Sequence, residues 1–179
     1  MKKLLPLLLI LFFITVSVCF SLAQVSKGQW MVGGYANITP ARFININISP
    51  TAGYMISNKI AVGAMLNVEY ANSDNAHYIS NYLIPTGRYY FGKSRTQPFI
   101  MVGFGVAHQI GVYKDNLQEN NSDFSYYGGG ALGLSHFVNN NIALEVLAGF
   151  SNSPITKFRG TFVNFGLQIF LNKKTNEEE

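Results

Sequence analysis

Apolar and polar side chains alternate with a period of two along most of the chain after residue 24. The clearest stretch begins at Phe43, where one face carries Ile44, Ile46 and Ile48 and the other carries Asn45, Asn47 and Ser49. Successive side chains of a β-strand point to opposite faces, so this period predicts strands rather than helices. Residues 60–70 repeat the pattern after the turn Ser57-Asn58-Lys59, which predicts an antiparallel hairpin.

The same pattern recurs until eight strands are predicted. Their expected ranges are 29–37, 43–56, 60–70, 78–91, 98–113, 124–137, 142–150 and 161–171. A strand needs about 9 to 11 residues to cross a bilayer at a tilt. Strands of soluble proteins are nearer five or six residues, as a rough norm, so the lengths favour membrane-crossing strands.

The connections between the predicted strands alternate in length. Short ones are expected at 57–59, 92–97 and 139–141, and longer polar ones at 71–77, 114–123 and 151–158. Up-and-down membrane barrels place short turns on the periplasmic side and longer loops outside. The first connection, 38–42, departs from this rule because it is short where a long loop is expected.

The composition agrees with a wall that faces lipid. Charged residues make up 12% of the chain, about half the soluble average of roughly 25%. Every backbone polar group inside a bilayer must be paired within the protein, so only a closed ring of strands is viable there. The sequence therefore predicts an all-β fold: an eight-stranded antiparallel up-and-down transmembrane β-barrel. Its lumen is expected to be narrow, with inward glycines leaving room for larger inward side chains.

The N-terminal residues have the pattern of a secretory signal peptide. Lys2 and Lys3 precede an apolar run to Cys19, and Ser21-Leu22-Ala23 supplies a small-x-small cleavage site. We expect a signal peptide at 1–23, the barrel at 24–171 and a charged periplasmic tail at 172–179. The alternatives are an uncleaved anchor helix and a lipoprotein modified at Cys19, the single cysteine of the chain.

Aromatic residues gather near the predicted strand ends, which suggests two girdles at the levels of the lipid headgroups. The expected periplasmic girdle comprises Tyr89, Tyr90, Phe91, Phe137 and Phe170. The expected outer girdle comprises Phe43, Tyr70, Tyr78, Tyr113, Phe124, Tyr126 and Phe150. The alternative is ordinary sheet packing, because aromatic residues are common in strands.

Two segments resemble the small bacterial outer-membrane β-barrel family of the OmpA/OmpX type. They are the strand Pro98-Phe99-Ile100-Met101-Val102-Gly103-Phe104-Gly105 and the segment Arg88-Tyr89-Tyr90-Phe91 before a turn. The resemblance implies a place in the outer membrane among its lipids and lipopolysaccharide, after folding by the barrel-assembly machinery. In the last strand, Asn164, Gly166, Ile169 and Leu171 look like the signal that this machinery reads. The chain departs from that signal because Phe170 is out of phase and eight residues follow Leu171.

Three charged residues are expected to face the lumen by strand parity: Glu69, Arg88 and Glu145. Charges in a confined interior are costly unless they are paired. We hypothesise that Arg88 pairs with Glu145 across the lumen and that the charges are structural; the alternative is that trapped water solvates each one.

No motif for catalysis, a metal or a cofactor stands out. His77, His108 and His136 lie far apart in the predicted topology. Ser135, His136 and Glu145 suggest a hydrolase triad of the lipid A-modifying kind, but adjacent strand residues point to opposite faces. The 13 basic and 9 acidic residues nearly balance, which does not indicate a nucleic-acid partner.

The favoured function is a structural, adhesion or surface-interaction role, exercised by a barrel with a largely plugged lumen. A narrow porin or small-solute channel is the first alternative and a lipid A-modifying enzyme is the second. The sequence does not identify an extracellular ligand.

Overall fold

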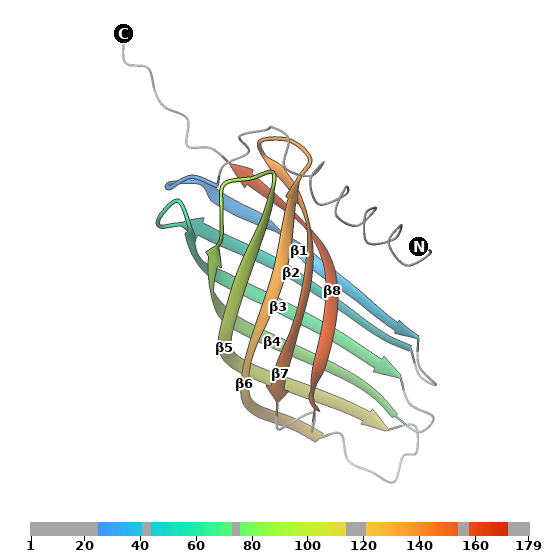
Figure 1. The fold of residues 1–179 in the computed structure, drawn as a ribbon. Coiled ribbons are helices and arrows are strands. Elements are labelled where there is room, and N and C mark those ends of the chain that lie inside the picture. Colours follow the sequence, from blue (N-terminus) through green and yellow to red (C-terminus); the bar gives the residue numbers. More distant parts are fainter. Residues whose placement is uncertain (1–24, 41–43, 73–75, 114–120, 154–157, 172–179) are drawn as a thin grey trace, which may run out of the picture.

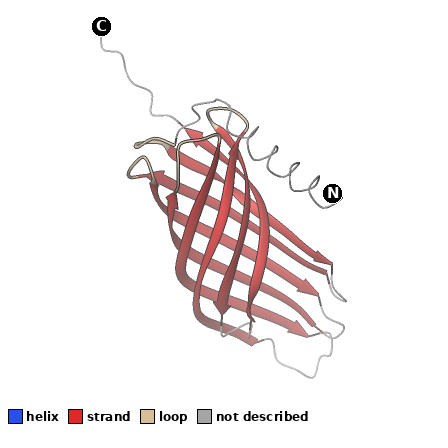
Figure 2. Ribbon diagram, viewed as in Figure 1, coloured by secondary structure: helices blue, strands red, loops and turns tan. Residues whose placement is uncertain are grey.

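Eight antiparallel strands close into one barrel in the computed structural model, which describes residues 25–40, 44–72, 76–113, 121–153 and 158–171 (Figures 1 and 2). The strands are β1 (Trp30–Pro40), β2 (Ile44–Met55), β3 (Ile60–Asn72), β4 (Ala76–Tyr90), β5 (Thr96–Tyr113), β6 (Asn121–Phe137), β7 (Ile142–Ser153) and β8 (Phe158–Leu171). The predicted fold class is confirmed. The predicted signal peptide and charged tail lie outside the described residues.

Each strand pairs with the next along the chain, and β8 pairs with β1 to close the ring. Val25, Leu171 and three tight turns lie at one end of the barrel, called the turn end below; the opposite end is called the loop end (Figure 1). Polar side chains stabilise two of the tight turns. Ser57 Oγ accepts hydrogen bonds from the backbone N–H groups of Lys59 and Ile60, and Asn139 Oδ1 accepts them from those of Asn141 and Ile142.

The strands continue further at the loop end than the side-chain pattern predicts. β5 and β6 pair as far as Gly111 with Asn121, and β7 continues to Ser153. The connections expected at 71–77, 114–123 and 151–158 were therefore too long, since the gaps between strands are 73–75, 114–120 and 154–157. Backbone ladder bonds do not depend on side-chain polarity, so polar residues extend these strands without leaving an alternating apolar pattern.

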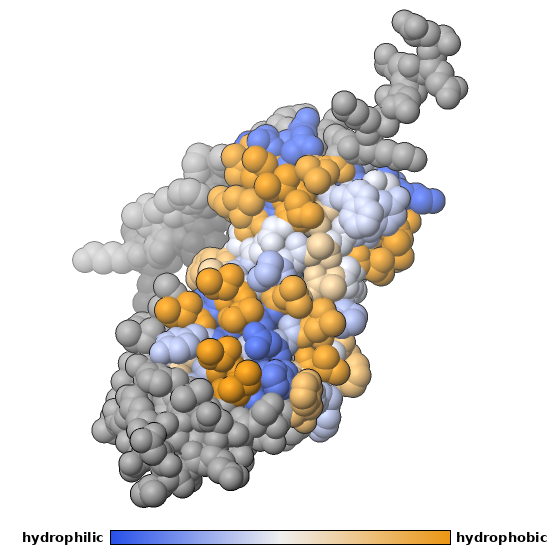
Figure 3. Space-filling view, turned by 180° about the vertical axis from the view of Figure 1, so that it is seen from behind, coloured by the Kyte–Doolittle hydropathy of each residue, from blue (hydrophilic) through white to orange (hydrophobic). Residues whose placement is uncertain are grey.

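The outer face of the barrel is apolar. It includes Ile48, Leu66, Val102, Phe104, Leu132 and Phe165, all more than half exposed. Hydrophobic side chains make up much of the described wall on the face seen in Figure 3. Among the strand residues whose side chains are described, none that faces outward is Asp, Glu, Lys or Arg. Exposed basic residues occur instead in the turn-end segments, at Lys27, Lys59, Lys93 and Arg95.

The lumen face carries the core. Glycines on this face make room for rings on neighbouring strands, as the sequence predicts. A Cβ atom at Gly133 would lie 2.3 Å from Cζ of Phe99, its partner across the β5–β6 pair. A Cβ atom at Gly166 would lie 2.4 Å from Cδ1 of Tyr35, its partner across the β1–β8 pair. Both rings thus occupy the space that a side chain at the partner glycine would need.

The described part of the chain contains no helix with the length and apolarity needed to span a membrane.

Candidate functional site

A buried ion pair crosses the lumen near the turn end. Arg88 of β4 places Nη1 3.2 Å from Oε2 of Glu145 of β7, and both side chains are almost fully buried. Their strands are three apart in the ring, so the contact spans the interior rather than following the wall. A charge-assisted contact of this kind holds opposite walls at a fixed separation.

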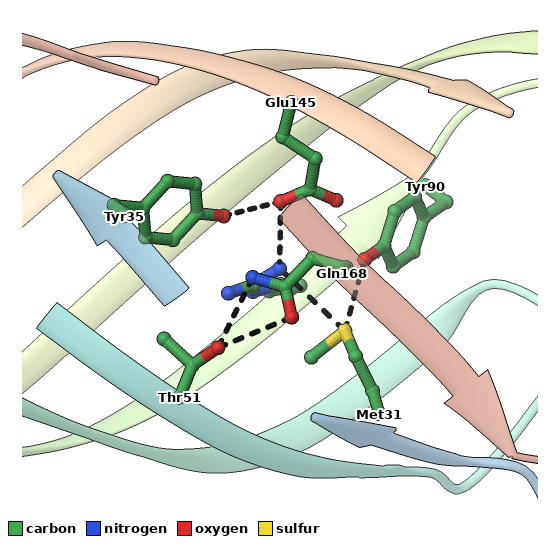
Figure 4. Close-up of polar contacts among 7 residues, drawn as sticks. Met31, Tyr35, Thr51, Tyr90, Glu145 and Gln168 are labelled. Atoms are coloured by element: carbon green, nitrogen blue, oxygen red, sulfur yellow. Dashed lines mark hydrogen bonds and ion pairs between the residues drawn. The ribbon is translucent and has the colours of Figure 1, made fainter. Parts of the chain in front are cut away.

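Neighbouring side chains surround this pair, and Figure 4 labels five of them together with Glu145. The hydroxyl of Tyr35 donates to the same Glu145 oxygen. The sulfur of Met31 accepts hydrogen bonds from Arg88 Nη1 at 3.6 Å and from the Tyr90 hydroxyl at 3.4 Å. The Arg88 guanidinium carbon also lies 5.6 Å from the ring centroids of Tyr35 and Phe99, within the range of a cation–π contact.

A second polar contact lies beside this cluster. Thr51 of β2 and Gln168 of β8 exchange two hydrogen bonds of 3.0 and 3.1 Å, although β1 separates their strands. Gly33 of β1 lies between them, paired with Thr51 on one side and Gln168 on the other. This contact therefore follows the wall over β1, whereas the Arg88–Glu145 pair crosses the lumen (Figure 4).

Glu69 does not join the ion pair, so the three predicted lumen charges do not form one network. It pairs with Ser80 on β4, eight residues before Arg88, which is about 26 Å along the strand. Its carboxylate accepts a hydrogen bond of 3.3 Å from the Tyr82 hydroxyl. Strand parity places a residue on a face but does not give its depth along the barrel.

An aromatic cluster fills the lumen at the turn end, and we call it the aromatic stopper. It consists of Tyr90, Phe99, Phe137 and Phe170, each no more than 1% exposed. Tyr90 lies against Phe99 with centroids 5.4 Å apart, and Phe137 lies against Phe170 at 5.2 Å. Within each pair the two rings are in contact, and all four belong to one buried cluster.

The stopper corrects the predicted periplasmic girdle. Tyr90, Phe137 and Phe170 were expected at the headgroup level, but they point inward because they share a face with Arg88, Ser135 and Gln168 respectively. Only Tyr89 and Phe91 of that set lie on the outer face. Each of these rings lies two residues from an inward-facing polar residue. This spacing is the sequence signal that would have placed the rings on the lumen face.

The outer girdle is present in part. Tyr70, Phe124, Tyr126 and Phe150 are exposed on the outer face. Tyr78 lies on the lumen face by the alternation of β4, so its predicted place in the girdle was wrong. Phe43 lies outside the described residues, and the side chain of Tyr113 is not described.

The residues before β1 pack against the turn end of the barrel. Val25 is buried, and the N–H of Lys27 donates to Asn58 Oδ1 in the β2–β3 turn. Gly28 adopts a φ of 91°, a conformation that favours glycine. Its N–H bonds the carbonyl of Met55, while Met55 N–H bonds the carbonyl of Gln29. Residues 25–29 thus pack against the turn end of β2, and Val25 belongs to the same buried cluster as the rings of the aromatic stopper.

Ser135 and His136 point to opposite faces of β6. Ser135 is fully buried in the lumen opposite Glu145, while His136 is exposed and contacts Thr96 Oγ1 through Nδ1 at 2.8 Å. A nucleophile and its base must reach hydrogen-bonding distance, and this arrangement keeps them apart. Within the described residues, no three His, Cys, Asp or Glu side chains gather as a metal site would require.

The four residues of the predicted assembly signal divide between the two faces of β8. Asn164 and Gly166 face the lumen, where Asn164 Oδ1 accepts a hydrogen bond of 3.1 Å from Asn37. Ile169 and Leu171 face outward. Gly166 has a packing role as well, because the Tyr35 ring lies across it. Recognition of this segment by an assembly machinery stays a prediction.

A closed antiparallel barrel with an apolar, uncharged outer face and its charges inside is a transmembrane β-barrel. Among solved structures, Neisserial surface protein A matches 79% of this chain and 94% of its own, with a TM-score of 0.61 and 13% identity. The N-terminal β-barrel domain of OprF from Pseudomonas aeruginosa matches 81% and 98%, with a TM-score of 0.56 and 12% identity. The outer-membrane protein OprG from Pseudomonas aeruginosa matches 86% and 100%, with a TM-score of 0.54 and 15% identity.

The chain thus shares the fold of these small outer-membrane β-barrels, which is the fold class that the sequence predicts. No family model matches the sequence, and no curated protein matches it.

Proposed function

We propose that this chain is an integral protein of the bacterial outer membrane with a lumen closed to solutes, and that it acts as a structural or surface-interaction protein. The observation that carries the proposal is the dense packing of the lumen at the turn end. Residues 25–29 pack against the turn end of β2, the aromatic stopper lies in the lumen at that end, and the Arg88–Glu145 pair lies two residues deeper along β4.

The outer face supports the membrane location. Placing Arg or Lys in the middle of the lipid-facing wall costs about 2–4 kcal/mol. The described outer face carries none in its strands and has its basic residues in the turn-end segments. With the turn end toward the periplasm, the long β5–β6 hairpin would project from the cell, which suits a role in contacts at the surface.

Conductance in a planar bilayer tests the closed lumen. The unaltered protein is expected to give no steady ion current, because the rings of the stopper pack the lumen at the turn end. The variant Tyr90→Ala/Phe137→Ala removes two rings of the stopper from different strands and is expected to conduct weakly.

The matched control is Tyr89→Ala/Phe91→Ala. These rings lie at the same end of the barrel but on the outer face. Their loss should therefore not allow a steady ion current through the lumen. A steady current from the unaltered protein would contradict the closed lumen and favour the narrow channel. Mass analysis of lipid A from cells that express the protein tests the enzymatic alternative, and no mass change is expected.

A further inference from the structure

The strand pairing that closes the barrel stops early at the seam between β1 and β8. It runs from Trp30 with Leu171 to Ala36 with Phe165. Beyond that level β1 continues to Pro40 and β8 begins at Phe158, but among the described pairs residues 38–40 pair with β2 and residues 158–164 pair with β7. The two strands diverge toward the loop end in Figure 1.

The split lies at a depth where the outer face is still apolar. The paired part of the seam spans seven residues of each strand, whereas a crossing strand needs about 9 to 11. Ile46 lies two residues beyond the last paired level on β2, and Val163 lies two residues beyond it on β8; both side chains are exposed. In the membrane location proposed above, both side chains face lipid beside the split.

Two amide side chains, those of Asn37 and Asn164, lie at the split on its lumen side, and that of Asn47 lies one strand away on β2. Asn37 of β1 donates through Nδ2 to the backbone carbonyl of Val163 and to Asn164 Oδ1 at 3.1 Å. Asn47 pairs with Asn37 across the β1–β2 ladder and accepts a hydrogen bond of 2.9 Å from Ser49. The Asn37 side chain thus bridges the strands where the backbone ladder has ended, in a neutral surface rich in donors and acceptors.

A split in a barrel wall at lipid depth exposes strand edges to hydrocarbon, which only polar groups can stabilise. We propose that this seam is a lateral binding site for an acylated membrane lipid. The acyl chains lie against Ile46 and Val163 on the outside, and the ester and hydroxyl groups of the lipid bond the amides of Asn37 and Asn164. The proposal rests on the membrane location proposed above and adds a ligand that the closed lumen does not require.

Tryptophan fluorescence tests the site in phosphatidylcholine vesicles whose acyl chains are brominated, since bromine quenches an indole only near contact. Trp30, the single tryptophan, is first replaced in Trp30→Phe. In that background, Asn47→Trp places an indole on the lumen side of the seam, while the matched control Gln109→Trp places one on the lumen face of β5, across the barrel. We expect several-fold stronger quenching for Asn47→Trp than for Gln109→Trp.

A disulfide across the β1–β8 seam gives a second test of the site. Residues 38 and 163 would face each other if the ladder continued in register, and the described residues contain no cysteine. Oxidation of Ile38→Cys/Val163→Cys should close the seam and reduce the quenching of Asn47→Trp to the level of the control, with reduction restoring it. Equal quenching of both indoles, or quenching unchanged by oxidation, would overturn the lipid site while leaving the closed barrel intact. A protein whose gel migration does not change on heating would overturn the membrane barrel itself.

Discussion

Arg88 and Glu145 form a buried pair that is incompletely satisfied by its surroundings. Arg88 Nε and Glu145 Oε1 have no hydrogen-bond partner among the described residues. A buried ion pair gives little net stability compared with apolar residues of similar size, but leaving one charge alone costs about 3–5 kcal/mol. The pair therefore makes the folded state sensitive to the loss of either partner.

The variant Glu145→Leu is expected to lower the free energy of unfolding by about 3–5 kcal/mol, because Arg88 is left buried without its counter-ion. Urea-dependent unfolding in phospholipid vesicles measures the change. The double variant Arg88→Met/Glu145→Leu should recover much of the loss. A double variant less stable than Glu145→Leu would contradict this account.

Gly133 accommodates the Phe99 ring, and the conflict that a larger residue would create involves this ring alone. Gly133→Ala is expected to lower the free energy of unfolding by about 1–3 kcal/mol through overpacking. In the Phe99→Ala background the same change should cost much less, because the obstructing atoms are gone.

Gly128→Ala is the control on the same strand, because a Cβ atom there meets Phe104 Cδ2 at an ordinary 3.6 Å. It should leave the stability almost unchanged. Equal effects of Gly133→Ala with and without the Phe99 ring would show that the ring does not limit this position.

At the scale of the strand, the period of two carries most of what the sequence could predict. It identified eight strands and placed Arg88 and Glu145 on the lumen face, because lipid outside and a confined interior impose opposite demands on alternate residues. It could not give the depth of Glu69, the contacts of Met31 and Gln168, or the early end of the β1–β8 ladder. Those depend on how strands are staggered around the ring, which no local pattern records.

The strand period also predicts where along the outer face of a strand a charged side chain is tolerated. Leu66 is the seventh of thirteen residues in β3 and faces outward. Leu66→Arg is expected to cost about 2–4 kcal/mol, the value for the bilayer midplane, whereas Ile60→Arg at the turn end of the same strand should cost about 0–1 kcal/mol. Urea titration in vesicles compares the two. Similar costs at both positions would place the membrane elsewhere on the barrel.

The whole molecule is one ring in which every strand has two neighbours, so no strand can leave without opening the barrel. Side chains from four strands meet in the aromatic stopper, and the ion pair joins β4 to β7. Such a closed, internally braced wall resists detergent until it is heated.

Gel migration in dodecyl sulfate should therefore depend on heating: the unheated protein should migrate as a compact band and the boiled protein as an extended chain. A scrambled sequence of the same composition is the control and should show one position. A single position for the native sequence would contradict the barrel.

The packing of residues 25–29 at the turn end has a practical consequence for anyone who labels or purifies this protein. Val25 is buried, and the two residues that follow Lys27 are hydrogen-bonded to Met55. A bulky tag fused directly ahead of Val25 would disturb this packing. A fluorophore attached in the β5–β6 connection at the opposite end would leave it unchanged.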